Sequence, residues 1–495
     1  MTEPTSMIEP TSMTEPASSL SSGLSRRSLL RGMAGGAAGL ALAPLLGSLP
    51  VQAAPTPGSN PGKYKLDLGG YTGPELTADT IQLRFMRQDY TPQTNALFAS
   101  IYQEFTKGYP NITIQEERVP YGDLTKKIQV YVASGSAPDL MMGRNDFATA
   151  YAAGQLTAPL QNYFSADYIS DISAPLRDSS TIDGNLLCLP WETNPTFMYF
   201  NRDIFTKHGV KTPPEVSDVS KGWSFDEMAA ALDELTKKIR ASGDTQTYAM
   251  ASSQYGNGGP GSNYAQMESM WVRMMGNNKA DPSSTVYKTF LGVSDDGFTA
   301  TGYLDTPEAI AGMANYQKLF KNGYTPTGNV SNQYLGGTAA IDFGTMNNAT
   351  WMRAQPTKFF NWGTSPAPHA TMYYSASVAD SPFIWAGGQH LNETAALLAF
   401  ICNDTNRMAF HSVWGSMPVR QSLLDKIPLY KTDQTNMLAA ATAAAGFGPP
   451  KTPGWFDYFN AVNPAVKDIA LGADPAATLH QVAQQIDGLL AKYKS

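Results

Sequence analysis

The most constraining part of this chain is the segment from residue 183 to residue 232, where two apolar strands are joined by a short polar turn. The first strand ends at Pro190, and the turn Trp-Glu-Thr-Asn-Pro follows it. The second apolar run, Phe197–Phe200, leads into a short helix that Gly209 is expected to end. A Ser-Phe-Asp-Glu sequence at Ser224 then predicts a capped start for the next helix. This order predicts that strands and helices alternate along the chain.

The same alternation begins near residue 80. Ile81–Met86 and Ile112–Gln115 have the composition of strands, and Thr94–Tyr109 between them has helical spacing of its apolar residues. A helix over Leu124–Ser134 and a strand over Asp139–Met142 come next. This βαβα order predicts a parallel sheet covered by helices, and therefore an α/β fold.

The first 53 residues are expected to be an export signal preceded by a disordered extension. The segment Ser25–Arg31 is a twin-arginine motif, the apolar run Met33–Leu49 follows it, and Val51–Ala53 forms a small-residue cleavage site. The alternative is an uncleaved transmembrane anchor, which is less favoured because the glycines of the run weaken a helix. Residues 54–78 are expected to be a flexible mature N-terminus, and the twin-arginine translocase is the export partner that the motif implies.

Size and composition narrow the class of protein further. About 440 residues remain after the leader, which exceeds one ordinary core and predicts two lobes. The formal net charge is −7, so no general affinity for nucleic acid is expected. Charged residues are only 16 % of the chain and aromatic residues are 11 %, a composition that suits a neutral ligand. Cys188 and Cys402 lie in apolar surroundings, and buried free thiols are favoured over a disulfide.

Several segments together resemble the bacterial extracellular solute-binding proteins of family 1, the maltodextrin-binding type that serves ABC importers. Besides residues 183–232, the segments that carry the resemblance are Ile81–Gln115, Gly135–Leu160, Leu335–Trp351, Ala386–Asn403 and Gly415–Arg420. The resemblance implies a two-lobe periplasmic-binding-protein fold that is type II-like. Each lobe would hold a mostly parallel sheet with flanking helices, and a ligand cleft would lie between the lobes.

The resemblance also implies how the chain is divided. Residues 79–190 and about 335–390 would form lobe 1, and about 191–334 and 391–495 would form lobe 2. The chain would cross between lobes near Pro190–Pro195 and near Trp385–His390. The implied protein is a monomer in the periplasm, or at the cell surface where the host has no outer membrane.

Candidate ligand contacts follow from the chemistry of a sugar, which offers C–H groups on its ring faces and hydroxyls on its edges. Polar groups at the first crossing and after strands suit the hydroxyls, because α/β sheets place ligands at the carboxyl ends of their strands. The expected polar contacts are Asp89, Arg144, Asn145, Asp146, Glu192 and Asn194, with the backbone of Gly387 and Gly388.

Aromatic plates are expected from five tryptophans: Trp191, Trp271, Trp351, Trp385 and Trp455. Trp351 matches the pocket tryptophan of the family, and Trp455 leads into a late helix that faces the cleft in the family. Packing remains the alternative for each of them. For Trp191 that alternative is contact between the lobes, and for Trp271 core packing is slightly favoured.

Enzyme and metal signatures are weak. Gly256–Gly261 matches a dinucleotide motif in its glycine spacing only, since Pro260 interrupts the loop and no second strand follows. The histidines lack metal-ligand spacing, and Asp295-Asp296 has the pattern of a solvated turn. No cofactor, metal or catalytic residue is expected. The expected function is capture of a mono- or oligosaccharide and its delivery to an ABC importer permease. A secreted carbohydrate-active enzyme, or a binder of a polyamine, phosphoester or metal ligand, is the alternative.

Overall fold

The computed structural model describes residues 66–252, 270–328, 330, 332–355 and 360–494. The expected leader, the segment 54–65 and the glycine-rich loop 256–263 lie outside these residues. Within the described part, no helix is long and apolar enough to cross a membrane. Cys188 and Cys402 are both buried and free, which confirms the expectation for the two thiols.

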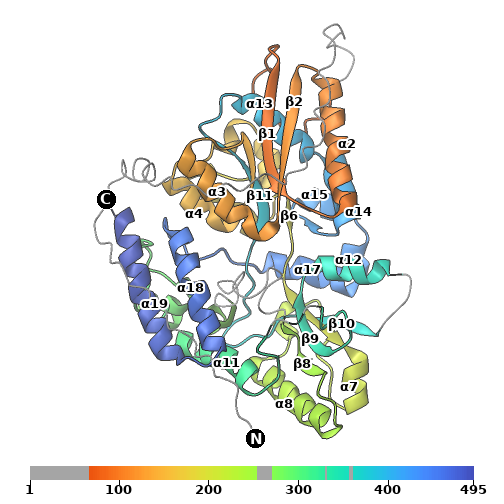
Figure 1. The fold of residues 1–495 in the computed structure, drawn as a ribbon, viewed down its shortest axis with the longest axis vertical. Coiled ribbons are helices and arrows are strands. Elements are labelled where there is room, and N and C mark those ends of the chain that lie inside the picture. The colour runs from red at the N-terminus through yellow and green to blue at the C-terminus, as the bar shows by residue number, and fades with distance from the viewer. Residues whose placement is uncertain (1–65, 253–269, 329, 331, 356–359, 495) are drawn as a thin grey trace, which may run out of the picture. The chain divides into compact units, whose positions relative to one another are not determined.

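The first lobe is built on a six-stranded sheet (Figure 1). Its strands, in spatial order, are β12 (Met417–Pro418), β6 (Glu192–Thr193), β11 (Ala379–Ile384), β3 (Leu140–Arg144), β1 (Ile81–Gln88) and β2 (Ile112–Val119). β1 pairs in parallel with β2 and β3, whereas β11 runs antiparallel to both β3 and β6. A small hairpin, β4 (Thr181–Ile182) and β5 (Asn185–Leu186), forms a separate pair.

Helices cover this sheet and cap its ends. They are α2 (Pro92–Gly108), α3 (Leu124–Ser134), α4 (Ala148–Ala153), α5 (Ala166–Ser170), α6 (Ala174–Ser180), α13 (Leu391–Ile401) and α14 (Asp404–Trp414). Short 3-10 turns, η1 (Tyr121–Asp123) and η2 (Asn145–Phe147), follow directly on β2 and β3. The core beneath α2 contains Phe85, Phe98, Phe105 and Trp191, all at most 2 % exposed.

The second lobe is built on a four-stranded sheet. Its order is β10 (Trp362–Ser365), β7 (Phe197–Asn201), β9 (Ala339–Gly344) and β8 (Tyr248–Met250), of which only β8 and β9 pair in parallel. The helices that accompany it are α7 (Arg202–His208), α8 (Phe225–Ala241), α10 (Thr285–Leu291), α11 (Pro307–Lys321), α12 (Met346–Ala354), α16 (Leu429–Thr432) and α17 (Gln434–Ala444). α15 (Gln421–Leu424) packs against β12 of the first sheet.

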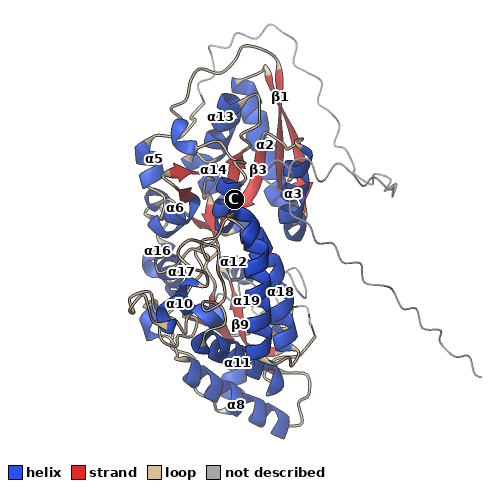
Figure 2. Cartoon of the chain, turned by 90° about the vertical axis from the view of Figure 1, so that its left-hand side faces the viewer, coloured by secondary structure: helices blue, strands red, loops and turns tan. Residues whose placement is uncertain are grey.

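Two long C-terminal helices complete the chain. α18 (Trp455–Ala470) and α19 (Pro475–Leu490) pack side by side and against α11 (Figure 2). Asp474 caps α19 through the backbone N–H of Ala477. α18 also contacts α4, a helix of the first lobe, so the C-terminal pair joins the two lobes.

Local signals in the sequence explain the boundaries of these elements. Asn201 accepts hydrogen bonds from the N–H groups of Asp203 and Ile204 at the start of α7, and Gly209 ends it at φ +58°, where a glycine carries no Cβ penalty. Ser224 and Glu227 form the complete capping box that the sequence predicts for α8. The α/β class and the two-lobe fold are therefore confirmed.

Strand direction and lobe boundaries differ from the expectation. Antiparallel pairs outnumber parallel ones in both sheets of the described chain, so "mostly parallel" is wrong. β9 and β10, which fall within the range expected for lobe 1, belong to the second sheet, whereas α13 and α14, expected in lobe 2, pack on the first lobe. The chain crosses at 194–196, as expected, but it returns at 366–378, before β11, and crosses again after β12. The second crossing was expected near Trp385–His390 because of the Gly387-Gly388 turn. Such a turn shows that the chain reverses its direction, but it does not show whether the next element belongs to the same sheet.

One buried carboxyl group of the second sheet gives a testable pH dependence. Asp342 lies opposite Tyr199 in the β7–β9 ladder, is 6 % exposed, and its Oδ1 has no hydrogen-bond partner among the described residues. Burial raises the pKa of Asp342 to about 7. Because the folded state binds the proton more tightly, stability that is present at low pH is lost as the pH rises through about 7.

We therefore expect Asp342→Asn to be less sensitive to pH than the unsubstituted chain. Between pH 5 and pH 8 the unsubstituted chain should lose about 2–3 kcal/mol relative to the variant, since each unit of pKa is worth about 1.4 kcal/mol. Urea unfolding of both proteins at the two pH values measures this difference. If the free energy of unfolding changed equally with pH in both proteins, the Asp342 carboxyl group would be solvated and the prediction would be wrong.

Candidate functional site

Three charged residues form a row across adjacent strands of the first sheet. Asp380, in β11, lies opposite Arg144 of β3 on one side and opposite Glu192 of β6 on the other. Cross-strand partners project from the same face with Cβ atoms about 5 Å apart. The sheet therefore presents a positive, a negative and a second acidic group side by side. We call Arg144, Asp380 and Glu192 the charged row.

Glu192 is the most enclosed member of the charged row. It is 1 % exposed, its Oε1 accepts a hydrogen bond from the hydroxyl of Tyr90 at 3.3 Å, and its Oε2 accepts one from Ser416. Burial raises the pKa of Glu192, and the facing carboxyl group of Asp380 raises it further, whereas the charge of Arg407 lowers it. The carboxyl group is thus fixed in orientation by donors on one side and by Asp380 on the other.

Arg144 is paired within its own turn. Its Nε and Nη2 donate to the two carboxylate oxygens of Asp146 at 3.0 and 2.5 Å. This bidentate geometry is the strong form of the ion pair and fixes the plane of the guanidinium group. Asp146 is 3 % exposed, and burial raises its pKa although the charge of Arg144 lowers it. The β3–η2 turn therefore supplies an oriented charge pair at the end of the row.

An exposed aromatic residue, Tyr121, lies beside the charged row. It begins η1 after β2 and is 41 % exposed as a whole residue, whereas burial of its hydroxyl group, with the nearby charges of Asp380 and Asp146, raises the pKa of Tyr121 and the charge of Arg144 lowers it. Sequence reasoning missed Tyr121, and it also missed Tyr90 and Asp380. For the two tyrosines the signal was available, because each follows a parallel strand of the same sheet.

The two predicted asparagines have different environments. Asn145 donates to Ser179 and to the carbonyl of Ser377, and its Oδ1 accepts from the N–H of Ala379 at 2.6 Å. Its side-chain atoms thus tie the end of β3 to α6 and to the segment around Ser377 and Ala379. Asn194 lies at the first crossing, and its buried Oδ1 has no hydrogen-bond partner within the described part of the chain. The side chain of Asn145 therefore has a structural role at the crossing, whereas the Oδ1 atom of Asn194 remains available to accept a hydrogen bond.

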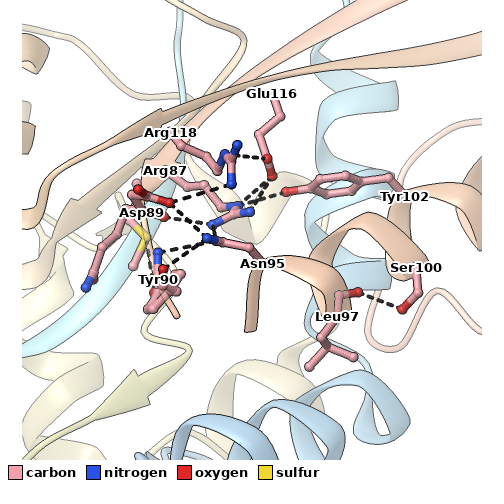
Figure 3. Close-up of polar contacts among 11 residues, drawn as sticks. Arg87, Asp89, Tyr90, Asn95, Leu97, Ser100, Tyr102, Glu116 and Arg118 are labelled. Carbon is pink, nitrogen blue, oxygen red and sulfur yellow. Dashed lines mark hydrogen bonds and ion pairs between the residues drawn. The ribbon is translucent and has the colours of Figure 1, made fainter. Parts of the chain in front are cut away.

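Asp89 lies in a separate surface network at the ends of β1 and β2 (Figure 3). Asn95 donates to its carboxylate at 2.9 Å, and Arg118 lies 3.7 Å away. In the same network the buried Arg87 pairs with Glu116 at 2.6 Å. The Asp89 side chain is about half exposed and is not part of the charged row, whereas the next residue, Tyr90, reaches Glu192.

Trp351 is the most exposed of the predicted tryptophans, at 46 %. It lies on α12, which begins just after β9. The neighbouring Thr350 contacts the carbonyl of Gly415 at 3.5 Å, and Ser416, the next residue, donates to Glu192. The helix that carries Trp351 therefore adjoins the loop that closes one side of the charged row.

Three predicted plates are packed in protein. Trp191 is 2 % exposed, contacts Phe98 and Phe410, and has the guanidinium group of Arg407 4.8 Å from its ring. Trp271 is fully buried in the core around α8 and α11. Trp455 is 3 % exposed and stacks on Tyr458 with ring centroids 5.0 Å apart. For these three, the geometry favours the packing alternative.

Trp385, Gly387 and Gly388 lie at the wrong end of the sheet for a shared site. β11 is antiparallel to β3, so Asp380 meets the carboxyl end of β3 and Ile384 meets its amino end. Trp385 continues from that amino end, where its N–H donates to the carbonyl of Asp139. Trp385 is five positions along the strand from Asp380, a distance of about 16 Å. The structure does not bring this turn to the charged row.

A surface pocket of about 310 Å³ occurs elsewhere, in the second lobe. It is lined by Asn201, Asp203, Ile204, Lys207, Leu335, Gly336, Gly337 and Phe360. No member of the charged row contributes to it. Among the described residues, no group of three His, Cys, Asp or Glu side chains could hold a metal ion.

Two α/β lobes joined by several crossings, with a charged row beside the first crossing, define a two-lobe ligand receptor. Residues 100–443 match the family described as bacterial extracellular solute-binding protein. The chain belongs to this family, which confirms the resemblance seen in the sequence.

Individual relatives agree with this assignment. A binding protein of Brucella abortus is 24 % identical over 432 residues, which cover 84 % of this chain and 95 % of the relative. A solute-binding protein of an ABC transporter from Thermotoga lettingae, bound with α-D-tagatose, is 16 % identical with a TM-score of 0.66, covering 83 % of this chain and 99 % of that one. The sugar-binding protein MalE of Xanthomonas citri is 18 % identical with a TM-score of 0.64, covering 84 % and 98 %.

Proposed function

We propose that this chain is a receptor that captures a mono- or oligosaccharide between its two lobes and delivers it to the permease of an ABC importer. The observation that carries the proposal is the charged row with the exposed ring of Tyr121 beside it. Oriented carboxylate and guanidinium groups suit the hydroxyl edges of a sugar, and an aromatic ring suits its C–H face. The sugars bound by the Thermotoga lettingae and Xanthomonas citri proteins support the same ligand class.

The proposed ligand contacts differ in part from those expected from the sequence. We retain Arg144, Asp146, Glu192, Asn194 and Trp351, and we add two residues, Tyr121 and Asp380. Asp89 is proposed as a contact at the rim, because its side chain is held at the edge of the same sheet. We propose further that the twin-arginine signal directs the protein to the periplasm or the cell surface, where it acts as a monomer.

Binding would require closure of the lobes about their crossings. The chain passes between the lobes three times, so relative motion is restricted to a hinge. A ligand that contacts both the charged row and α12 would favour the closed form, because only that form makes both sets of contacts. The closed form is then the state that the permease would recognise.

A thermal-shift screen tests the ligand class. The panel should include D-tagatose, maltose and maltotriose, with spermidine, glycerol phosphate and zinc chloride for the alternative ligands. A sugar at 100 times its dissociation constant should add about 2.7 kcal/mol of stability. Chromatography of the recovered sugar separates receptor from enzyme. Recovery of cleaved sugar, or stabilisation by spermidine alone, would contradict the proposal.

Trp351→Ala and Tyr121→Ala are each expected to weaken binding of the stabilising sugar with little change in ligand-free stability. Both residues are more than 40 % exposed, so their truncation removes little core packing. Loss of a stacked ring should cost on the order of 2 kcal/mol in binding free energy. Titration calorimetry measures this loss. Val413→Ala, which removes another exposed apolar side chain, is the matched control. Equal effects of all three substitutions would refute the stacking roles.

A further inference from the structure

Asp380 and Glu192 are in an unusual relation for two acidic residues. They face each other directly in the β6–β11 ladder, and like charges at such a position normally destabilise a sheet. Glu192 is 1 % exposed, and its burial, together with the facing carboxyl group of Asp380, raises its pKa above the ordinary value of a glutamate. Two carboxyl groups that face each other in a buried site do not both ionise readily, so one proton is expected to stay between them.

The surroundings of the pair favour a single retained proton. Two cations act on the pair: Arg144 of β3 lies opposite Asp380 in the ladder, and the charge of Arg407 of α14 acts on both carboxyl groups. Burial raises the pKa of both carboxyl groups, and each cation lowers the pKa of the carboxyl groups on which it acts. The other titratable or polar groups that face the pair are Tyr90 after β1, Tyr121 of η1, Asp146 of η2 and Ser416 before β12.

We propose that Glu192 and Asp380 share one proton, and that Asp380 thereby restricts the site to uncharged, hydroxyl-rich ligands. With one proton shared, the pair carries a single negative charge. Arg144 and Arg407 are positive and Asp146 is negative, so the site as a whole is neutral. A cationic or anionic ligand gains no net attraction there and still loses its hydration. A sugar hydroxyl both donates and accepts, and therefore matches a pair that contains one acid and one carboxylate.

The proton can be tested without any ligand, which separates this inference from the proposed function on which its ligand-class part rests. Asp380→Asn and Glu192→Gln each replace the shared proton with an amide donor and leave one carboxylate. The raised pKa means that stability held at neutral pH is lost as the second carboxyl group ionises at higher pH. Urea unfolding at pH 7 and pH 9 should show a larger loss for the unsubstituted chain than for either variant. Equal losses in all three proteins would overturn the shared proton.

Ligand selectivity is tested with the same proteins at the same two pH values. D-tagatose, maltotriose and spermidine serve as probes in titration calorimetry. The sugar affinity of the unsubstituted chain should fall about tenfold from pH 7 to pH 9, because the shared proton is lost over this range. A tenfold change in affinity corresponds to about one unit of pKa. The ratio of affinities at the two pH values should be close to one for Asp380→Asn. An unchanged ratio in the unsubstituted chain, or spermidine binding at pH 7, would overturn the role of Asp380 in selectivity. Unequal unfolding losses without sugar binding would refute the proposed function and leave the shared proton intact.

Discussion

Replacing Trp191 with alanine is expected to lower the free energy of unfolding by about 3–5 kcal/mol, the usual cost of removing a large aromatic side chain from a core. The indole ring is 2 % exposed and packs edge-on against Phe85 at 6.5 Å between centroids. It also lies 4.8 Å from the guanidinium group of Arg407. Its loss leaves a cavity beneath α2 and removes a cation–π contact.

Urea unfolding without ligand measures the effect. Trp191→Phe, which keeps an aromatic ring with a smaller volume, should lose less than half as much stability. Sugar affinity, measured under conditions where Trp191→Ala remains folded, should change by less than the loss seen for Trp351→Ala. A variant with normal stability and tenfold weaker sugar binding would return Trp191 to the ligand site.

The contrast between Trp191 and Glu192 shows how far the sequence reaches. The turn after Pro190 was correctly predicted to cross between lobes and to carry polar groups. Neighbouring residues of an extended strand project to opposite sides, so one turn can supply both a core side chain and a side chain of the charged row. A pattern of residue types does not show which of the two lies in the core. The register of β6 against β11 places Glu192 opposite Asp380.

Strand direction limited the prediction more than residue type did. Arg144 and Asp146 were predicted as contacts because they lie at the end of a strand, and a parallel sheet collects such ends at one edge. Asp380 was missed because it lies near the start of β11, and Trp385 was misplaced because it lies at the end of the same strand. Because β11 runs antiparallel to β3, the start of β11 lies at the edge where the parallel strands end, and the end of β11 lies at the opposite edge. The direction of β11 depends on the crossing at 366–378, which no local sequence signal marks.

Removing the carboxyl group of Asp146 is expected to be as costly as removing Trp191, but for an electrostatic reason. Asp146 is 3 % exposed and binds Arg144 through two hydrogen bonds, so Asp146→Ala leaves the guanidinium group of Arg144, a residue only 9 % exposed, without its main partner. Breaking a buried ion pair in this way costs about 3–5 kcal/mol. Urea unfolding measures the loss, and sugar binding should weaken with it.

The double variant Arg144→Met with Asp146→Leu separates stability from function. Replacing both partners with apolar side chains of similar volume often restores stability, because no charge remains buried alone. We therefore expect the double variant to unfold within about 1 kcal/mol of the unsubstituted chain. Its sugar affinity should remain reduced, since the polar groups that would meet the hydroxyls are gone. Recovery of affinity together with stability would show that this pair supports the fold and does not contact the ligand.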